Sequence, residues 1–428
     1  PMEKYTVKKL NKKNNINASV PGSKSITNRA LMLAAMSDGI CTLNGVLFSS
    51  DSRAFLDCLI SLGFSVQIDE ESANVVIKGE NGRIPNRKAT INVQSAGTAA
   101  RFMTVFLAVA GGDYTLQSSE QMKKRPMSEL LDSLTAKGVE IKCLEEEGHF
   151  PFEIHSKGIK SGNIKIDTTT SSQYASALLM ASVMNGMNVE LTGSRVDGAY
   201  IKITTNMLKQ FDIDFDREGN TYIIKKQSYI CNVYNVEPDM SAACYFYAMA
   251  ALLGISITVS GVHEESLQGD VEFVHILEKM GCICEDTPEG ICVSKPANGI
   301  LKGVDVNMHS CSDQAITLAA IAPFADTPTT IRGIAHIRLQ ESNRIAAICT
   351  ELTRMGIRCE EGEDSITIWP GTPKPALIQT YDDHRMAMGF SLVGLRAEGI
   401  VINDPMCCKK TFEHYFDVLD EIVEKIQM

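Results

Sequence analysis

The segment Ser171–Leu191 reads SSQYASALLMASVMNGMNVEL, and this short stretch contains the pattern that decides the fold. Polar residues open it, a run that is apolar along nearly its whole length follows, and Gly186 separates this run from MNVEL. A helix without a polar face is typical of a helix that is buried on most sides. Gly186 can adopt the left-handed conformation that commonly ends helices, and the residues after it favour a strand. The segment therefore predicts a buried helix that leads directly into a strand.

The same arrangement occurs five more times along the chain. The other copies are SKSITNRALMLAAMSDGICTL (23–43), GTAARFMTVFLAVAGGDYTL (97–116), DMSAACYFYAMAALLGISITV (239–259), CSDQAITLAAIAPFADTPTTI (311–331) and HRMAMGFSLVGLRAEGIVI (384–402). The predicted helix ends are Gly39, Gly112, Gly186, Gly254, Asp326 and Gly399, which follow one another at intervals of 68 to 74 residues. A nearly constant period of this size indicates a repeat protein.

A second predicted helix recurs in the same phase. These helices end at Gly63, Gly138, Asp212, Gly281 and Gly356, at intervals of 69 to 75 residues, and YFDVLDEIVEKIQM (415–428) supplies a sixth helix. Each unit therefore reads strand, helix, strand, helix, strand. An ordinary alternation of strands and helices with similar loop lengths is the simpler alternative, but two interleaved series favour six copies of one α/β unit.

Composition and charge exclude several classes of protein. The net charge of −11 disfavours a nucleic-acid binder, whose surface should be basic. The 13 cysteines are scattered without a CxxC pair, which favours reduced thiols and no metal site. No apolar run reaches the ~18 residues of a membrane helix, and the polar start PMEKYTVKKLNKKNN lacks the apolar region of a signal peptide. We therefore expect a cytoplasmic enzyme that binds neither membrane, nucleic acid nor metal.

Polar residues collect at the start of each buried helix. The positions 15 residues before the six predicted helix ends are Lys24, Gly97, Ser171, Asp239, Cys311 and His384. Serine and aspartate are good N-caps, which accounts for Ser171 and Asp239 without any function. N-capping does not account for the cations Lys24, Arg29, Arg101 and Arg385. Cations near a helix N-terminus oppose its dipole, so a bound anion is the better explanation.

The second helices carry further charged residues near their starts. These are Arg125, Arg344 and Lys410, and their matching phases favour anion binding over three unrelated surface charges. Asp313 lies at the start of a buried helix, and Glu341 precedes the turn that leads to Arg344. Such a pair can act as general base and acid, although carboxylates among cations are often structural ion-pair partners.

Several blocks of the chain resemble a known family. PGSKSITNRALMLAAMSDG (21–39) closely resembles the N-terminal signature of the EPSP synthases, the 3-phosphoshikimate 1-carboxyvinyltransferases among the enolpyruvyl transferases. Other blocks that resemble this family follow in the family's order, and together they cover essentially the whole chain. They are SAGTAAR (95–101), RPMSELLDSLTAKG (125–138), SSQYASALLMAS (171–182), SDQAITLAAIAPFAD (312–326), ESNRIAAICTELTRMG (341–356), YDDHRMAMGFSL (381–392) and KTFEHYFDVL (410–419).

The resemblance implies a fold and a domain division. The fold would be an α/β, two-domain inverse α/β barrel of six βαβαββ repeats, three in each domain, with a cleft between the domains. One domain would span residues 21–237, on the side of shikimate 3-phosphate. The other would join residues 1–20 to 238–428 and carry the catalytic carboxylates.

The resemblance also implies a reaction. The 5-hydroxyl of shikimate 3-phosphate would attack C2 of phosphoenolpyruvate while C3 is protonated, and the tetrahedral adduct would then lose phosphate. No metal or organic cofactor is needed, and we expect a monomer whose partners are these two small molecules. The implied pathway makes chorismate and the aromatic amino acids, and the implied inhibitor is glyphosate.

The family's functional residues carry over position by position. Shikimate 3-phosphate would be bound by Lys24, Ser25, Arg29, Ser171, Ser172, Gln173, Asp313 and Gln340. Phosphoenolpyruvate would be bound by Lys24, Gly97, Arg125, Gln173, Arg344, Arg385 and Lys410. Lys24 would bridge both substrates, Asp313 would be the base for the 5-hydroxyl, and Glu341 would be the acid and base at the methylene carbon. His384 would support Glu341 or the leaving phosphate.

Four positions depart from the family pattern. The family's usual lysine is Gln340 here, its common asparagine four residues earlier is His336, and the proline that often follows the arginine of the AGTA block is Phe102. Asp197-Gly198-Ala199-Tyr200 stands where the family has Ser-x-Pro-Tyr. These departures affect the expected contacts to the ring hydroxyls and one phosphate contact. Either Gln340 is tolerated there or nearby Arg338 supplies the missing charge.

Two other functions compete with this one. The sister enzyme that acts on UDP-N-acetylglucosamine has Lys-Asn where this chain has Lys24-Ser25, and it usually carries a cysteine in a loop that here, over 111–126, contains none. A non-catalytic relative that binds phosphorylated metabolites is the second alternative, and Gln340 supports it. The joint presence of Lys24, Asp313, Glu341 and Arg385 opposes it.

Overall fold

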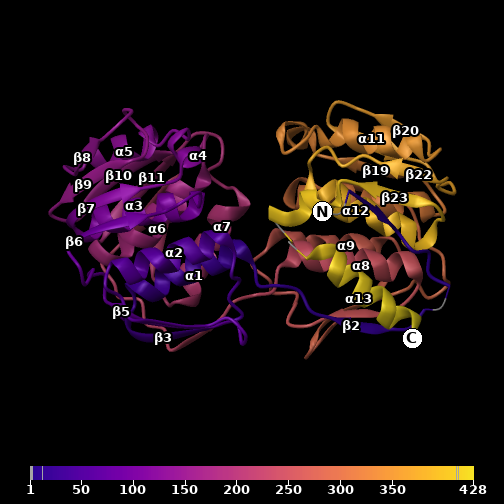
Figure 1. Cartoon of the computed structure of the whole chain (residues 1–428), viewed down its shortest axis with the longest axis horizontal. Coiled ribbons are helices and arrows are strands. Elements are labelled where there is room, and N and C mark those ends of the chain that lie inside the picture. The colour runs from indigo at the N-terminus through magenta and orange to yellow at the C-terminus, as the bar shows by residue number, and fades with distance from the viewer. Residues whose placement is uncertain (1–2, 12, 411, 413) are drawn as a thin grey trace. The chain divides into compact units, whose positions relative to one another are not determined.

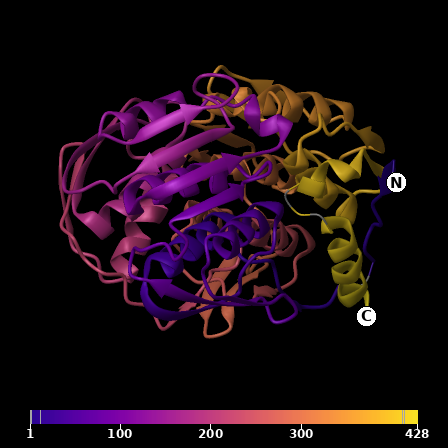
Figure 2. The same ribbon diagram turned by 60° about the vertical axis from the view of Figure 1, so that its left-hand side comes forward.

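The computed structural model describes residues 3–11, 13–410, 412 and 414–428. The chain divides into two compact units, one formed by residues 21–237 and the other by residues 1–20 together with 238–428. Figures 1 and 2 show the ribbon from two directions, with the first unit in indigo to magenta and the second mainly in orange and yellow.

The unit of residues 21–237 contains both helices and strands, and several of its strands follow one another without an intervening helix. Its helices are α1 (Lys24–Met36), α2 (Ser50–Ser61), α3 (Gly97–Ala110), α4 (Glu120–Lys123), α5 (Ser128–Thr135), α6 (Ser172–Asn185) and α7 (Ala199–Gln210). Its strands are β3 (Asp38–Asn44), β4 (Val66–Asp69), β5 (Asn74–Glu80), β6 (Lys88–Asn92), β7 (Gly112–Gln117), β8 (Glu140–Cys143), β9 (Phe152–Ser156), β10 (Gly162–Asp167), β11 (Met187–Thr192), β12 (Phe215–Glu218), β13 (Thr221–Ile224) and β14 (Val233–Asn235).

The other unit also contains helices and strands, and its strands are shorter on average. Its helices are α8 (Met240–Leu253), α9 (Glu272–Lys279), α10 (Ala315–Ile321), α11 (Arg344–Arg354), α12 (His384–Arg396) and α13 (Tyr415–Gln427), with the 3-10 turns η1 (Gly269–Val271), η2 (His309–Gln314), η3 (Ala322–Phe324), η4 (Ala335–Leu339) and η5 (Pro405–Lys410). Its strands are β1 (Lys4–Thr6), β2 (Ile16–Ala18), β15 (Ile257–Val259), β16 (Ile283–Thr287), β17 (Gly290–Ser294), β18 (Asp305–Asn307), β19 (Thr329–Arg332), β20 (Cys359–Glu361), β21 (Ser365–Ile368), β22 (Ala376–Ile378) and β23 (Ile400–Asn403).

Within the described ranges, the strands form six small sheets, of which five have four strands in one shared topology and the sheet β1-β23-β22 has three. The sheet β6-β7-β9-β8 is representative, because β6 and β7 are parallel while β9 is antiparallel to both β7 and β8. The elements of this repeat follow the order βαβαββ once the short α4 is set aside. The prediction from residues alone, with three strands in each unit, was therefore one strand short.

Three repeats borrow a strand from a distant part of the chain. In the unit 21–237, β14 returns from the far end to pair in parallel with β3. In the other unit, β2 pairs in parallel with β15, and β1 is antiparallel to β23, with Lys4 opposite Asn403. Each unit is therefore closed by pairing between its first and last segments.

The residues after the second helices have the predicted conformation. Four of these residues directly follow a helix C-cap, namely Gly63, Asp212, Gly281 and Gly356, whereas Gly138 lies two residues after the C-cap Ala136. All five have φ between 58° and 104°. This left-handed region favours glycine, and the one aspartate among them belongs to a residue type that tolerates it better than most.

The predicted ends of the first helices were partly wrong. Gly186 and Gly254 are left-handed C-caps, as predicted, but α1 ends earlier, at Ser37 rather than Gly39. The Ser37 hydroxyl donates to the Ala34 carbonyl at 2.7 Å, which satisfies a terminal acceptor without glycine. The helices α3, α10 and α12 also end before the predicted residues Gly112, Asp326 and Gly399. Their C-caps are Gly111, Ala322 and Ala397. Near Asp326, Pro323 lies in the tighter turn η3 that follows α10.

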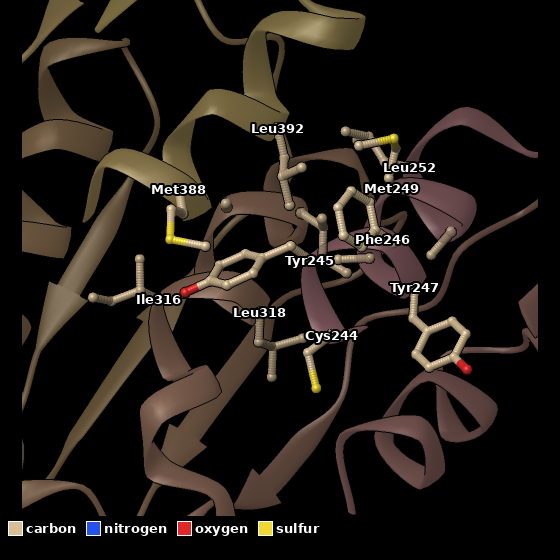
Figure 3. Close-up of a cluster of buried hydrophobic side chains, with 14 of the residues drawn as sticks. Cys244, Tyr245, Phe246, Tyr247, Met249, Leu252, Ile316, Leu318, Met388 and Leu392 are labelled. Carbon is tan, nitrogen blue, oxygen red and sulfur yellow. The ribbon is translucent and has the colours of Figure 1, made fainter. Parts of the chain in front are cut away.

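The buried helices form the centre of each unit. Almost every residue of α3, α6 and α8 is buried, as the absence of a polar face predicted. Figure 3 shows α8, α10 and α12 of the second unit meeting through Tyr245, Ile316 and Met388, while Tyr247 points to another side of α8. Because the helices are covered on their sides, their polar N-terminal ends are the parts left to form a site.

Candidate active site

In the unit 21–237, two arginines converge on the first residue of α3. A Cβ added to Gly97 would lie 3.0 Å from Nη1 of Arg101 and 3.0 Å from Nη1 of Arg125. Among the described residues, no carboxylate lies within ion-pair distance of either guanidinium, and Nε of Arg101 is buried without a hydrogen-bond partner. Two cations that meet at a helix N-terminus without a neighbouring carboxylate are suited to bind an anion.

Gln173 joins the start of α6 to the same place. Its amide oxygen accepts a hydrogen bond from Arg101, and its Nε2 donates to Thr98 Oγ1 at 3.1 Å. The backbone of Gln173 is held by Ser171 Oγ, the N-cap of α6, at 3.1 Å. The next residue, Tyr174, donates to the Pro126 carbonyl at 3.0 Å and so fixes the segment that carries Arg125.

Arg29 of α1 is a buried cation surrounded by neutral acceptors. Only 2% of it is exposed, and it donates to Thr204 Oγ1 at 2.7 Å and to Ser176 Oγ and the Ser25 carbonyl at 3.0 Å. Burial lowers its pKa to about 10, because no carboxylate in the described part of the chain balances the charge. The guanidinium anchors Ser25 and leaves a positive potential at the starts of α1 and α6.

Lys24 is the accessible cation of this group. It is the first residue of α1, its side chain is 55% exposed, and its Nζ lies 2.9 Å from Asp51 Oδ2. Ser25 is half-buried and Ser172 is buried at the start of α6. Seven of the residues predicted for this unit therefore lie on or next to the first turns of α1, α3 and α6: Lys24, Ser25, Arg29, Gly97, Ser171, Ser172 and Gln173. Arg125 lies on the segment that the hydrogen bond of Tyr174 holds.

In the other unit, Arg344 is the centre of a buried ion pair. Its Nε donates to Asp383 Oδ2 at 2.8 Å and its Nη2 to Asp383 Oδ1 at 3.2 Å, which is a bidentate pair. Arg344 is only 4% exposed and Asp383 is fully buried. Burial alone would raise the pKa of Asp383, but Arg344 holds it below its usual value. The remaining amino group, Nη1, donates to Gln340 Oε1 at 2.6 Å and reaches Asp313 at 3.4 Å.

Asp313 lies between two guanidinium groups. Its Oδ1 is 3.4 Å from Arg344 Nη1 and its Oδ2 is 3.5 Å from Arg385 Nη2. Arg385 and, less strongly, Arg344 hold the pKa of Asp313 below its ordinary value, although burial opposes ionisation. The side chain of Asp313 is still 36% exposed, so this carboxylate remains accessible from solvent.

Glu341 and His384 form the second titratable pair. His384 Nδ1 lies 3.0 Å from Glu341 Oε2, and this hydrogen bond lowers the pKa of Glu341. The other ring nitrogen, Nε2, is buried without a partner in the described residues. His384 is the first residue of α12, whose N-cap is Asp383, so the ion pair with Arg344 also fixes where the imidazole lies.

The structure shows the contacts of Gln340 and His336, two of the residues that depart from the family pattern, and of Arg338. Gln340 accepts from Arg344, so its amide holds a cation instead of supplying one. Arg338 turns to Glu361 at 2.6 Å and to the Gly362 carbonyl at 2.8 Å, which disfavours it as the substitute charge. His336 Nε2 lies 2.8 Å from Ser312 Oγ, next to Asp313, and its ring packs edge-on against His309 at 5.1 Å.

Two neighbours of the predicted site residues, Asp51 and Asp383, were given no role from the sequence. Asp51 pairs with Lys24, and Asp383 orients Arg344, yet each lies far along the chain from its partner. The side chain of Lys410 lies outside the described part of the chain, so its predicted role stays a prediction.

A metal ion fits this arrangement poorly. Glu341, Asp383 and His384 offer oxygen and nitrogen atoms within 4.8 Å of one another. However, both Asp383 oxygens bind Arg344, and Glu341 is already bonded to His384. A cation there would displace a buried guanidinium, so these residues suit an anionic substrate better.

Comparison with known proteins identifies the family. A model of EPSP synthase (3-phosphoshikimate 1-carboxyvinyltransferase) matches residues 10–419. The chain belongs to the EPSP synthase family. It is 39% identical to a 3-phosphoshikimate 1-carboxyvinyltransferase of Nostoc punctiforme, over 99% of this chain and all of the relative. The chloroplastic 3-phosphoshikimate 1-carboxyvinyltransferase of Arabidopsis thaliana is also 39% identical, over 95% of this chain and 82% of the relative.

Comparison with solved structures confirms the fold class. An EPSP synthase of Acinetobacter baumannii superimposes with a TM-score of 0.86 at 25% identity, covering 98% of both chains. The enolpyruvyl transferase NikO of Streptomyces tendae shares the fold with a TM-score of 0.69 at 16% identity, over 97% of this chain and 96% of that chain. None of the described helices combines the length and apolar character needed to cross a membrane.

Proposed function

We propose that this EPSP synthase family member transfers the enolpyruvyl group of phosphoenolpyruvate to the 5-hydroxyl of shikimate 3-phosphate and releases phosphate. The observation that carries this proposal is Asp313, an accessible carboxylate kept ionised by Arg344 and Arg385 at 3.4 and 3.5 Å. An ionised base beside two cations suits a reaction in which a hydroxyl loses its proton next to an anionic substrate.

Asp313 and Glu341 divide the proton transfers. Asp313 takes the proton of the 5-hydroxyl while the oxygen of this hydroxyl forms a bond to C2 of phosphoenolpyruvate. Glu341 protonates C3. In the second step the bond from C2 to the phosphate oxygen breaks, and Glu341 recovers the proton from C3. His384, bonded to Glu341 at 3.0 Å, orients this carboxylate and can exchange a proton with it.

The cations divide between the two substrates. Lys24, Ser25, Arg29, Ser171, Ser172 and Gln173 bind shikimate 3-phosphate, with Gln340 near the ring. Gly97, Arg125, Arg344, Arg385 and Lys410 bind phosphoenolpyruvate, together with Lys24 and Gln173. The buried charge of Arg29 and the pair of guanidiniums at Gly97 support this division, because neither has an acidic partner among the described residues.

The two units supply different parts of this chemistry. Residues 21–237 carry the uncompensated cations, while residues 1–20 with 238–428 carry Asp313, Glu341 and His384. We propose that both sets act on the same pair of substrates. One chain contains every proposed residue, which supports a monomer. All 13 cysteines, each within the described ranges, are free thiols, as expected in the reducing cytoplasm.

A phosphate-release assay tests the proposal. The purified protein should release phosphate only when shikimate 3-phosphate and phosphoenolpyruvate are both present, and Asp313→Asn should abolish release. The control is Asp305→Asn, which changes an exposed carboxylate paired with Arg332. Release with UDP-N-acetylglucosamine instead of shikimate 3-phosphate would indicate the sister enzyme, and binding without any release would indicate a non-catalytic relative.

A further inference from the structure

Asp270 is a half-buried carboxylate in the second unit that the proposed chemistry does not use. It lies in η1 and accepts hydrogen bonds from the Ser241 hydroxyl and from Gln314 Nε2, the latter at 3.0 Å. Gln314 Nε2 also donates to Ser241 Oγ at 3.0 Å. Ser241 in turn accepts from Arg385 Nη2 at 3.2 Å. A hydrogen-bond path therefore leads from Asp270 to the guanidinium beside Asp313.

The hydrogen atoms of this network allow only one arrangement. Arg385 and the amide nitrogen of Gln314 can only donate, so Ser241 Oγ must accept from both with its two lone pairs. The single hydroxyl proton of Ser241 is then left for Asp270. Thr317 donates to Gln314 Oε1 at 2.9 Å and thereby fixes which end of that amide faces Ser241. Asp270 is thus the acceptor on which the orientation of the Ser241 lone pairs depends.

The local sequence Gln268-Gly269-Asp270 places this carboxylate. Gln268 donates to the Pro238 carbonyl at 2.8 Å and accepts from the Met240 backbone at 2.9 Å, so it ties η1 to the start of α8. Gly269 lies so close to η2 that an added Cβ would be 2.8 Å from the Ser310 carbonyl. The segment is therefore built to bring Asp270 against α8 and the residues next to Asp313.

Arg385 is held from two sides. Tyr245 accepts from its Nη1 at 3.3 Å, and the ring of Tyr245 is itself fixed in the core beside Ile316 and Met388, as Figure 3 shows. Ser241 and Asp313 take the other amino group. Burial and then the Asp313 charge raise the pKa of Asp270, while Arg385 and the hydrogen bonds from Ser241 and Gln314 oppose this rise.

We propose that Asp270, acting through Ser241 and Gln314, is a positioning residue that holds Arg385 in the orientation needed to bind the phosphoenolpyruvate carboxylate. Without this network, Arg385 would keep Asp313 as its main charged partner and turn toward it. This inference deepens the proposed function and rests on it. In this proposal, Asp270 keeps the Arg385 guanidinium oriented toward the substrate.

Steady-state kinetics on two variants test the inference. Ser241→Ala removes the acceptor facing Arg385 but leaves the bond between Gln314 and Asp270, so the fold should persist. It should raise the KM for phosphoenolpyruvate about tenfold or more, as expected for a lost hydrogen bond to a charged group. The KM for shikimate 3-phosphate and kcat should change less than about threefold. The variant weakens the binding of phosphoenolpyruvate equally in the ground state and in the transition state, and such a loss raises only the KM for this substrate. Asp270→Ala should behave alike.

Conservative variants separate positioning from general damage. Asp270→Asn keeps an acceptor for Ser241, and Ser241→Thr keeps the hydroxyl, so both should restore most of the affinity for phosphoenolpyruvate. Asp305→Asn is the matched control on β18 and should leave all constants unchanged. Ser241→Ala with an unchanged KM for phosphoenolpyruvate, or with both KM values raised equally, would overturn the inference.

A crystal structure of Ser241→Ala gives a readout that does not need activity. The Arg385 guanidinium should move away from the Ser241 side, and its Nη2 should approach Asp313 more closely than the present 3.5 Å. An unmoved guanidinium would refute the positioning role even in an active enzyme. Absence of turnover in the unmodified protein would instead refute the proposed function, while the guanidinium position would still decide this inference.

Discussion

The pKa of Asp313, the proposed base, should depend on what its two neighbouring arginines bind. In the free protein, Arg385 and Arg344 keep its pKa below the ordinary value. A substrate carboxylate bound to these guanidiniums would neutralise them, and the pKa of Asp313 should then rise. The acid limb of kcat, which reports the enzyme–substrate complex, should therefore lie at higher pH than the acid limb of kcat/KM. Steady-state rates across pH check this, and limbs in the reverse order would contradict it.

Lys24 offers a test of the anion-binding side. Its exposed ammonium has Asp51 as its ion partner, and exposed pairs of this kind contribute only about 0–1 kcal/mol to stability. Lys24→Ala should therefore leave the melting temperature nearly unchanged while turnover falls by about a hundredfold or more, since charge-assisted contacts to two anions are lost. Lys88→Ala, at an exposed position on β6, is the control. An active Lys24→Ala enzyme would refute the site.

Gly97 leaves room for an anion at the start of α3. A methyl group there would lie 3.0 Å from the ends of Arg101 and Arg125, which can shift at little cost to folding. Gly97→Ala should therefore weaken inhibition by glyphosate strongly and raise the KM for phosphoenolpyruvate by a smaller factor. Inhibition curves for both proteins measure this. An unmodified protein that glyphosate does not inhibit would contradict the expected competition at Gly97.

At the scale of elements, the turn before α12 is anchored from α11. Tyr381 and Asp382 have φ of 55° and 52°, a region costly for residues other than glycine. Buried Glu351 holds this turn, because it accepts from the Tyr381 hydroxyl at 2.5 Å and the Gln379 backbone at 2.9 Å. Asp383 follows the turn directly and orients Arg344.

Glu351→Gln should therefore affect both stability and activity. The amide has one acceptor oxygen instead of two, so the Tyr381 hydroxyl or the Gln379 backbone loses its acceptor, and the charge paired with Arg354 at 2.9 Å is removed, at a cost of about 1–3 kcal/mol. Urea denaturation should show this loss, and kcat should fall because the start of α12 is less well fixed. Glu360→Gln, on an exposed residue of β20, should change neither quantity. A stable, fully active Glu351→Gln variant would show that the turn needs no anchor.

Local signals explain what the sequence could and could not predict. The glycines after the second helices were found because a left-handed residue is a requirement of its own short segment. The early end of α1 was missed because Ser37 can close a helix through its hydroxyl, which leaves no unusual residue as a sign. Helix starts predicted Lys24, Gly97 and Ser171 as neighbours of a site, since N-terminal polar groups are also local.

Contacts between distant segments could not be predicted in this way. Strand β14 pairs with β3 although almost 200 residues separate the two strands, and the three residues of β14 contain no pattern that predicts this partner. The same holds for Asp270, whose importance depends on Ser241 and Gln314 on other elements. A carboxylate has no periodic pattern, so only the three-dimensional structure distinguishes this one from an exposed residue.

At the scale of the whole molecule, residues 21–237 form a continuous unit with their own core. Expressed alone, this fragment should fold, bind shikimate 3-phosphate and show no turnover, because Asp313 and Glu341 are absent. Circular dichroism and calorimetric titration measure both properties. A fragment of residues 21–230 lacks β14, which leaves an edge of β3 unpaired, and it should be markedly less stable. Equal stability of the two fragments would contradict the closing role of β14.

The pairing of β1 with β23 has a consequence for how the protein is made. Lys4 pairs with Asn403, so this ladder cannot form until residue 403 has left the ribosome. At about 5–20 residues per second, the first strand waits roughly 20–80 s for its partner. During that time the unit 21–237 can already complete itself, because its last strand emerges near residue 235. Biosynthesis thus separates the two folding events in time, and the late one leaves an unpaired strand exposed to chaperones and to neighbouring nascent chains.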